Sequence, residues 1–223
     1  MKKFMLLVIM CGVILSCGTA GAEVKVLVAY FSRSGNTEAM AKIIAEHLRK
    51  TMSVNEFRIV PAEDYPDDYT ELRDIAQEEK KNNTRPEIKY NTDLSGYDTI
   101  FLGYPIWWGT TPMIIRTFLE NHDFGGKKIY PFNTHGGSGK GTSVDDIKNL
   151  LPRVSVGDGF AIRGDSVNAS TSSITEWVDS LKISGTTSSS KDSSDSSSGC
   201  NVGYSSVLMI LGFATYILKT KSL

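Results

Sequence analysis

The sequence VKVLVAYFSRSGNTE, residues 24–38, joins an apolar run to a loop of small and polar residues. Its first part, residues 24–31, is rich in β-branched side chains and nearly continuous in apolar character. That pattern is typical of a strand buried on both faces of a parallel sheet. After the loop, apolar residues recur at the spacing of one helical face, at Ala41, Ile44, Ala45 and Leu48. The stretch therefore predicts a strand, a loop and a helix in direct succession.

The same alternation continues to about residue 183. Further strands are predicted at residues 54–60, 99–104, 128–134 and 154–162. Further helices are predicted at residues 68–81, 111–121, 143–151 and 173–181. Five strands alternating with five helices predict a doubly wound α/β fold, a five-stranded parallel sheet with helices on both faces. The ligand crevice of such a sheet lies at the carboxyl ends of its strands. Because Pro131 removes one ladder hydrogen bond, we expect an irregularity in the fourth strand.

Composition narrows the classes of function before any motif is considered. The 223 residues carry a formal net charge of −1, which argues against a basic surface for nucleic acid. The three cysteines, Cys11, Cys17 and Cys200, all lie outside residues 23–183. The central domain is therefore expected to have no disulfide, no thiol nucleophile and no cysteine-ligated metal.

Residues 1–22 have the order of a secretory signal peptide, with two lysines, an apolar run and then small residues. Two processing sites compete. Cleavage after Ala20-Gly21-Ala22 leaves Glu23 as the first residue, whereas a lipobox ending in Cys17 leaves a lipidated cysteine. An uncleaved membrane anchor is the third alternative, although the apolar run is short for a bilayer.

The last forty residues fall into two parts. Residues 184–199 are nearly all Ser, Gly, Thr, Lys and Asp, which predicts a flexible linker. Residues 200–223 begin with a cysteine and contain an apolar run closed by Lys219 and Lys221, which predicts a membrane anchor or a processed sorting tail. Either end places the domain, by expectation, outside the cytosol and near a membrane.

The loop after the first strand, residues 32–38, opens a helix and is made of small and hydroxyl-bearing residues. Backbone amides at a helix N-terminus, with hydroxyl groups beside them, form a cradle for phosphate. The loop has neither the P-loop lysine nor the dinucleotide glycine pattern. An ordinary capped turn is the alternative interpretation.

The loops after the third and fourth strands are also unusual. In the former, residues 105–112, Trp107 and Trp108 are adjacent, so at least one should be exposed in the crevice, where an indole face stacks on planar ligands. An aromatic patch for a partner protein is the alternative. In the latter, residues 134–141, four glycines predict close backbone approach or positive φ, the alternative being a mobile surface loop. His135 is expected either to donate a hydrogen bond to a ligand or to have a structural role.

Together these three loops, in this order and spacing, resemble those of bacterial flavodoxins, over roughly residues 24–181. The resemblance implies flavin mononucleotide (FMN) as the cofactor. It places the FMN phosphate on the first loop, the isoalloxazine ring beside the second, with Trp107 or Trp108 stacked on it, and the third loop over the other edge. The candidate cofactor-binding residues are therefore Ser32, Arg33, Ser34, Gly35, Asn36, Thr37, Pro105, Ile106, Trp107, Trp108, Gly109, Thr134, His135, Gly136, Gly137, Ser138 and Gly139.

The chain departs from that family in one respect. Flavodoxins place a tyrosine in the third loop against the second face of the ring, and here no aromatic residue occurs between His135 and Phe160. One face of the flavin is therefore expected to be bare.

The resemblance implies electron transfer through the flavin, without a catalytic acid or base. Because the expected export would put cytosolic electron donors out of reach, we expect the redox partner protein to be associated with a membrane. The bare face motivates an alternative, an FMN-dependent reductase of quinones or similar small acceptors. A non-redox binding module is the third hypothesis.

Overall fold

The computed structural model describes residues 24–183. The predicted signal peptide (1–22), linker (184–199) and tail (200–223) lie outside the described residues. Within residues 24–183, no helix has the length and apolar character needed to cross a membrane.

The sheet is parallel throughout, and its strand order is that of a doubly wound fold. The strands are β1 (Lys25–Tyr30), β2 (Ser53–Arg58), β3 (Thr99–Pro105), β4 (Lys128–His135), β5 (Ser155–Val156) and β6 (Phe160–Arg163). They are ordered β2-β1-β3-β4-β5, with β6 also pairing with β4. The predicted fold class is thereby confirmed.

The predicted fifth strand is split into two short segments, and the split lies opposite Pro131. β5 pairs with Lys128 and Ile129, and β6 resumes the pairing at Phe132. Pro131 has no N–H to donate to a neighbouring strand, so the ladder is interrupted there. Gly159 adopts a φ of +73° at the break, where a Cβ would lie 3.3 Å from the Pro131 carbonyl oxygen. The expected irregularity therefore falls mainly on the strand next to the proline.

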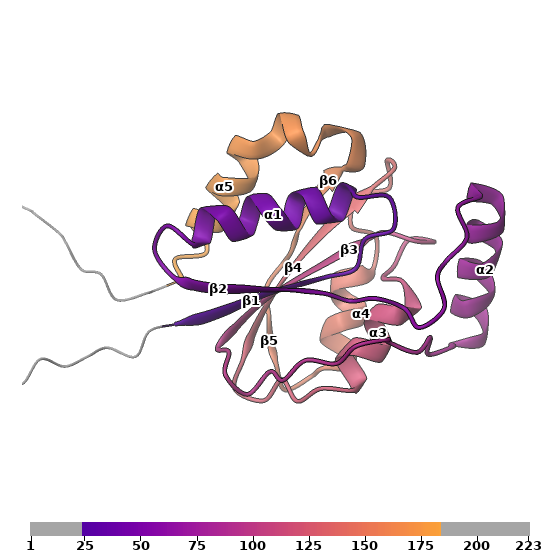
Figure 1. The fold of residues 1–223 in the computed structure, drawn as a ribbon, viewed down its shortest axis with the longest axis horizontal. Helices are drawn as coiled ribbons and strands as arrows, with labels where there is room; N and C mark the ends of the chain where they lie inside the picture. Colours follow the sequence, from indigo (N-terminus) through magenta and orange to yellow (C-terminus); the bar gives the residue numbers. More distant parts are fainter. Residues whose placement is uncertain (1–23, 184–223) are drawn as a thin grey trace, which may run out of the picture. The chain divides into compact units, whose positions relative to one another are not determined.

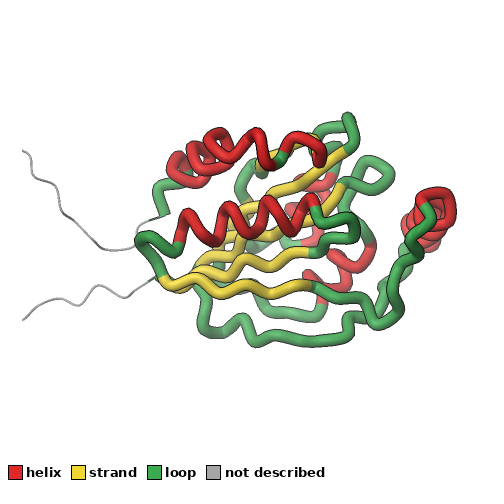
Figure 2. The backbone as a smooth tube through the Cα atoms, turned by 45° about the horizontal axis from the view of Figure 1, so that its top comes forward, coloured by secondary structure: helices red, strands yellow, loops and turns green. Residues whose placement is uncertain are grey.

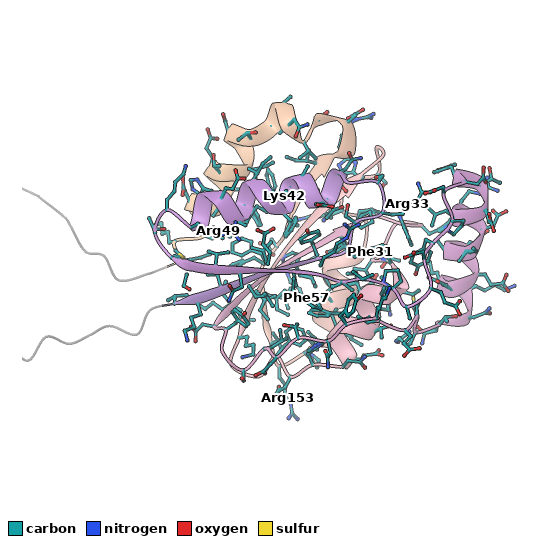
Figure 3. All side chains as sticks on the ribbon, in the orientation of Figure 1. Phe31, Arg33, Lys42, Arg49, Phe57 and Arg153 are labelled. Atoms are coloured by element: carbon teal, nitrogen blue, oxygen red, sulfur yellow. The ribbon has the colours of Figure 1, made fainter. Side chains whose placement is uncertain are left out.

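Four of the five α-helices cover the two faces of the sheet (Figure 1, Figure 2). Helices α1 (Asn36–Leu48) and α5 (Thr171–Ser180) pack on one face, and α3 (Met113–Glu120) and α4 (Ser143–Leu150) on the other. Two short 3-10 turns, Gly164–Ser166 and Asn168–Ser170, lead from β6 into α5. Figure 3 shows side chains filling the space between the sheet and both helical layers.

Helix α2 (Tyr69–Asn82) is placed differently from the other four. It stands beyond the carboxyl ends of the strands instead of lying on a face of the sheet (Figure 1). Its two buried apolar residues, Leu72 and Ala76, belong to neither hydrophobic core. The alternation of strands and helices predicted this helix but not its position.

Alternate residues of the central strands face the two cores. Val26 and Val28 pack towards α1, and Leu27 and Ala29 pack towards α3 and α4. All four have at most 1% of their surface exposed. Burial on both faces explains why this strand shows no polar alternation in the sequence.

Gly103, in the middle of β3, is a position where the core admits no side chain. A Cβ there would collide with the Phe132 ring and lie 2.9 Å from the Tyr30 Cβ. We expect Gly103→Ala to lower the free energy of unfolding by about 1–3 kcal/mol through overpacking. Gly96→Ala is the matched control, because a Cβ at Gly96 meets nothing within 4 Å. Denaturant unfolding of both variants tests this, and equal stabilities would contradict it.

Candidate functional site

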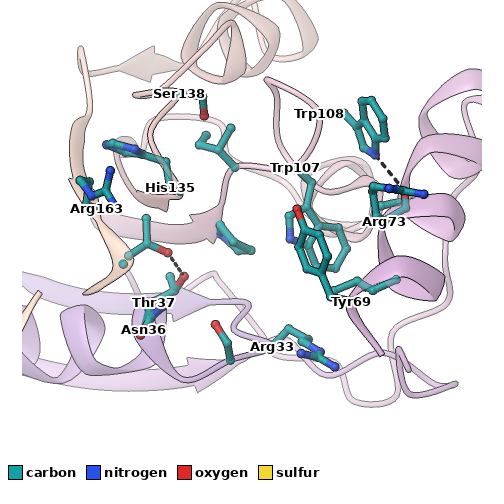
Figure 4. A pocket seen from close by; sticks show the side chains of 18 of the residues that line it. Arg33, Asn36, Thr37, Tyr69, Arg73, Trp107, Trp108, His135, Ser138 and Arg163 are labelled. Carbon is teal, nitrogen blue, oxygen red and sulfur yellow. Dashed lines mark hydrogen bonds between the residues drawn. The ribbon is translucent and has the colours of Figure 1, made fainter. Parts of the chain in front are cut away.

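A cleft of about 650 Å³ opens at the carboxyl ends of the strands, within the usual range of ligand pockets (Figure 4). The three predicted loops line it together, although they are far apart in the sequence. The predicted residues that line the cleft are Arg33, Ser34, Asn36, Thr37, Pro105, Ile106, Trp107, Trp108, Gly109, Thr134, His135, Gly136 and Ser138. The other four predicted residues, Ser32, Gly35, Gly137 and Gly139, belong to the same loops but are not among its lining residues.

The first loop leaves the N-terminus of α1 without a side-chain cap. Gly35 occupies the position before the helix with a φ of +88°, and no side chain accepts a hydrogen bond from the first turn. The amides of that turn have no partner within a helix and point out of its end, where the helix dipole favours an anion. Beside them, the Ser32 hydroxyl is buried and has no hydrogen-bond partner.

Two contacts join the start of α1 to other parts of the chain, at the end of β4 and just after β6. The hydroxyls of Thr37 and Thr134 are 2.8 Å apart and buried, which ties the start of α1 to the end of β4. The Asn36 side chain packs against Gly164, where a Cβ would collide with it. The segment after β6 thereby reaches the cleft.

Arg33 is the cation of the first loop, and its side chain turns towards the segment before α2. Its guanidinium donates to the Pro66 carbonyl and lies 3.3 Å from an oxygen of Asp67. Figure 3 shows Arg33 at the edge of the sheet beyond which α2 stands. The amides and hydroxyls of the loop, more than this arginine, therefore supply the donors for an anion.

The adjacent tryptophans have different environments. Trp107 is partly buried and makes edge contacts with Phe31 and Tyr65, at ring-centroid distances of 5.4 and 5.0 Å. Trp108 is 42% exposed, as adjacency predicted for at least one of the pair, and it has a φ of +49°. Its indole N–H donates to the Arg73 carbonyl of α2 at 2.9 Å.

Backbone contacts fix the conformation of this second loop. Trp107 and Thr110 exchange two backbone hydrogen bonds of 3.0 Å, which close a tight turn. The carbonyl of Trp108 accepts a hydrogen bond from Lys80 at 2.7 Å, and that of Gly109 accepts one from the Thr142 amide at 2.9 Å. The loop is thus held from α2 on one side and, on the other, from Thr142 at the start of α4.

Glycine is required in the third loop because its backbone passes directly over the second. A Cβ on Gly141 would collide with the Gly109 carbonyl, and Gly141 has a φ of +52°. Gly139 also has a positive φ, of +65°. These observations confirm the expected close approach and positive φ.

His135 points its Nδ1 atom back into the third loop, where it accepts a hydrogen bond from the Gly137 amide at 3.0 Å. Burial, and then the charge of Arg163, lower the pKa of His135, and the opposing influence of Asp165 is smaller. The neutral imidazole is therefore favoured at neutral pH, with its proton on Nε2. This nitrogen remains as a donor for a ligand.

Sequence reasoning missed two groups of residues that line the cleft. Arg163, Gly164 and Asp165 follow β6, and Tyr69, Leu72, Arg73 and Ala76 come from α2. The first group could have been predicted, because the ligand crevice of such a sheet lies at the carboxyl ends of its strands and these residues follow β6. The second group could not be predicted in this way. The spacing of apolar residues predicts an amphipathic helix, but it does not show which part of the protein the apolar face contacts. Among residues 24–183, no cluster of His, Cys, Asp and Glu is suited to hold a metal ion.

Two curated proteins share part of this sequence. An NAD(P)H dehydrogenase (quinone) of Cupriavidus metallidurans is 30% identical over 57% of this chain, and the flavodoxin-like domain-containing protein BilS of Clostridioides difficile is 31% identical over 38%. The matches span 66% and 49% of the lengths of these two relatives.

Solved structures match the domain over nearly their whole length. A candidate flavoprotein of Bacteroides uniformis is 33% identical, with a TM-score of 0.63 over 70% of this chain and 99% of its own. A flavoprotein of Lactobacillus acidophilus in complex with FMN is 27% identical, with a TM-score of 0.52 over 66% of this chain and 97% of its own.

The family model described as Flavodoxin matches residues 25–181, a range that includes every described strand and helix and all three loops of the cleft. The chain therefore belongs to the flavodoxin family.

Proposed function

We propose that this protein binds FMN in the cleft and transfers electrons through it. One observation carries the proposal: an uncapped helix N-terminus suited to a phosphate and an exposed indole suited to a planar ring line the same cleft. FMN has both of these parts. The family and the FMN complex of the Lactobacillus acidophilus flavoprotein support the same cofactor.

The residues of the first loop fit the phosphate of FMN. The amides at the start of α1 and the unpartnered Ser32 hydroxyl are donors without acceptors, and a phosphate supplies acceptor oxygens. The Arg33 guanidinium points towards Pro66, so the positive potential at this position comes from the helix dipole. Ser34, Gly35, Asn36 and Thr37 complete the loop around this position.

The other two loops fit the flavin ring. Pro105, Ile106 and Trp108 present apolar surface to the cleft, and His135 offers an N–H at its opposite end (Figure 4). A bound flavin supplies the redox chemistry, and the protein supplies binding, orientation and the surrounding charge. In the described cleft, Asp165 forms an ion pair with Arg163 at 3.0 Å. We assign the residues of these two loops a role in binding the flavin ring.

Ser32→Ala separates phosphate binding from protein stability. Since the Ser32 hydroxyl is buried without a partner, its removal should leave the free energy of unfolding of the flavin-free protein unchanged or slightly higher. A hydrogen bond to a charged group contributes about 1.5–3 kcal/mol, so the affinity for FMN should fall by about tenfold or more. Riboflavin, which lacks the phosphate, is the control ligand, and its affinity should not change. Fluorescence titration of both ligands measures this, and equal losses for the two would contradict the phosphate assignment.

The second candidate function is an FMN-dependent reductase of quinones or similar small acceptors. The observation that favours it is the 30% identity to a protein named NAD(P)H dehydrogenase (quinone). That relative is matched over 66% of its length, so its activity is a hypothesis for this chain.

Anaerobic mixing of the FMN-loaded protein with NADH or NADPH distinguishes the two candidates. For an electron carrier, the flavin absorbance should respond to a chemical reductant but not to the nicotinamides, and added quinone should give no catalytic turnover. Sustained oxidation of NAD(P)H by quinone would contradict the carrier and support the reductase.

We further propose that the protein acts outside the cytosol, with a membrane-associated redox partner. The signal-like residues 1–22 and the apolar tail 200–223 motivate this proposal. Fractionation of cells that produce the full chain should recover it with the membrane or the cell envelope. Recovery of the mature protein in the soluble cytosolic fraction would refute it.

A further inference from the structure

The apolar side of α2 faces the cleft, and it is the part of this helix with no structural partner in either core. Leu72 and Ala76 are only 7% and 6% exposed, line the cleft, and belong to neither hydrophobic core. Tyr69, three residues before Leu72, continues the same stripe into the cleft. Tyr69, Leu72 and Ala76 therefore line the cleft and do not pack on a face of the sheet.

Hydrogen bonds hold this helix against the second loop. Trp108 contacts α2 twice, through its indole N–H to the Arg73 carbonyl and through its own carbonyl from Lys80. Near the end of the helix, the carboxylate of Glu79 accepts a hydrogen bond of 3.0 Å from the hydroxyl of Tyr65, which precedes α2 in the chain. Burial raises the pKa of Tyr65, so its hydroxyl stays protonated as the donor. The helix is thereby positioned relative to the tryptophan loop before any ligand binds.

The side chain of Tyr69 is exposed and has no polar or aromatic partner among the described residues. It is 74% exposed at the start of α2, and within residues 24–183 it makes no side-chain hydrogen bond and no contact with another aromatic ring. Figure 4 shows its ring at the same end of the cleft as Trp107. An exposed aromatic ring at the edge of a ligand cleft is typical of a contact that a ligand completes.

The third loop contributes no such ring. The large aromatic side chains among the cleft's lining residues are Tyr69, Trp107 and Trp108, and Trp107 already packs on Phe31 and Tyr65. A planar ligand ring placed against the second loop therefore finds its remaining aromatic contact on α2.

We propose that α2 is a wall of the flavin-ring pocket and that Tyr69 packs its ring on the isoalloxazine of FMN. This inference rests on the proposed binding of FMN. It means that α2 supplies an aromatic contact with the flavin ring at the side of the cleft opposite His135 and Arg163 (Figure 4).

Three variants test the role of Tyr69. Tyr69→Ala removes the ring, Tyr69→Phe keeps the ring and removes the hydroxyl, and Tyr90→Ala removes a tyrosine that is also exposed, at 57%, but does not line the cleft. Stacking of an aromatic side chain on a heterocyclic base contributes about 1–3 kcal/mol, so Tyr69→Ala should bind FMN about tenfold more weakly. Tyr69→Phe and Tyr90→Ala should bind FMN as the wild type does.

Two further readouts distinguish ring contact from other effects. Because riboflavin has the same ring, Tyr69→Ala should weaken riboflavin and FMN binding by the same factor, unlike Ser32→Ala. An aromatic ring packed on a flavin quenches its fluorescence, so bound FMN should be brighter in Tyr69→Ala than in the wild type.

The outcomes separate this inference from the function on which it rests. Failure of the wild type to bind FMN would overturn the proposed function. Normal FMN binding by the wild type, with unchanged affinity and unchanged fluorescence in Tyr69→Ala, would overturn the role of Tyr69 alone. Weaker binding of FMN with unchanged binding of riboflavin would also overturn it, since the tyrosine would then act on the phosphate.

Discussion

Because β1, β3 and β4 pair in parallel, the loops that follow them all leave the sheet at the same edge. This constraint brings together residues 32–38, 105–112 and 134–141, which no local interaction would assemble. Right-handed crossovers then place α1 on one face of the sheet and α3 and α4 on the other, so that these helices do not cover that edge. The buried contact between the Thr37 and Thr134 hydroxyls fixes two of these loops to each other. The start of α1 and the end of β4 are therefore joined directly at this edge.

Several residues at the site have conformations or unpaired polar groups that lower the stability of the protein. An uncapped helix N-terminus forgoes about 1 kcal/mol, and the unpartnered Ser32 hydroxyl adds a desolvation cost. Trp108 combines a positive φ with an exposed indole. Departures of this kind concentrate at functional sites, because a ligand supplies the missing partners. Here all of them are consistent with one ligand that has a phosphate at one end and a flat ring at the other.

Helix α2 adds a wall to the cleft that the resemblance of the three loops did not predict. A helix on the face of the sheet would leave the cleft open beside the tryptophan loop. Standing at the carboxyl edge, α2 directs its only apolar stripe at the cleft and is fixed to Trp108 by two hydrogen bonds. Because the third loop has no aromatic residue, Tyr69 of α2 is the aromatic side chain that lines the described cleft besides the two tryptophans.

The sequence by itself determined the alternation of strands and helices, the doubly wound fold class and the three loops. Burial on both faces of a strand favours continuous apolar runs, and a close backbone approach requires glycine. Val26 to Ala29 and Gly141 are examples. Only the tertiary structure decided which tryptophan is exposed, where Pro131 breaks the neighbouring strand, and that residues 163–165 reach the cleft. It also decided the position of α2. The reason is that periodicity reports which face of an element is apolar, whereas the partner of that face depends on contacts between residues far apart in the chain.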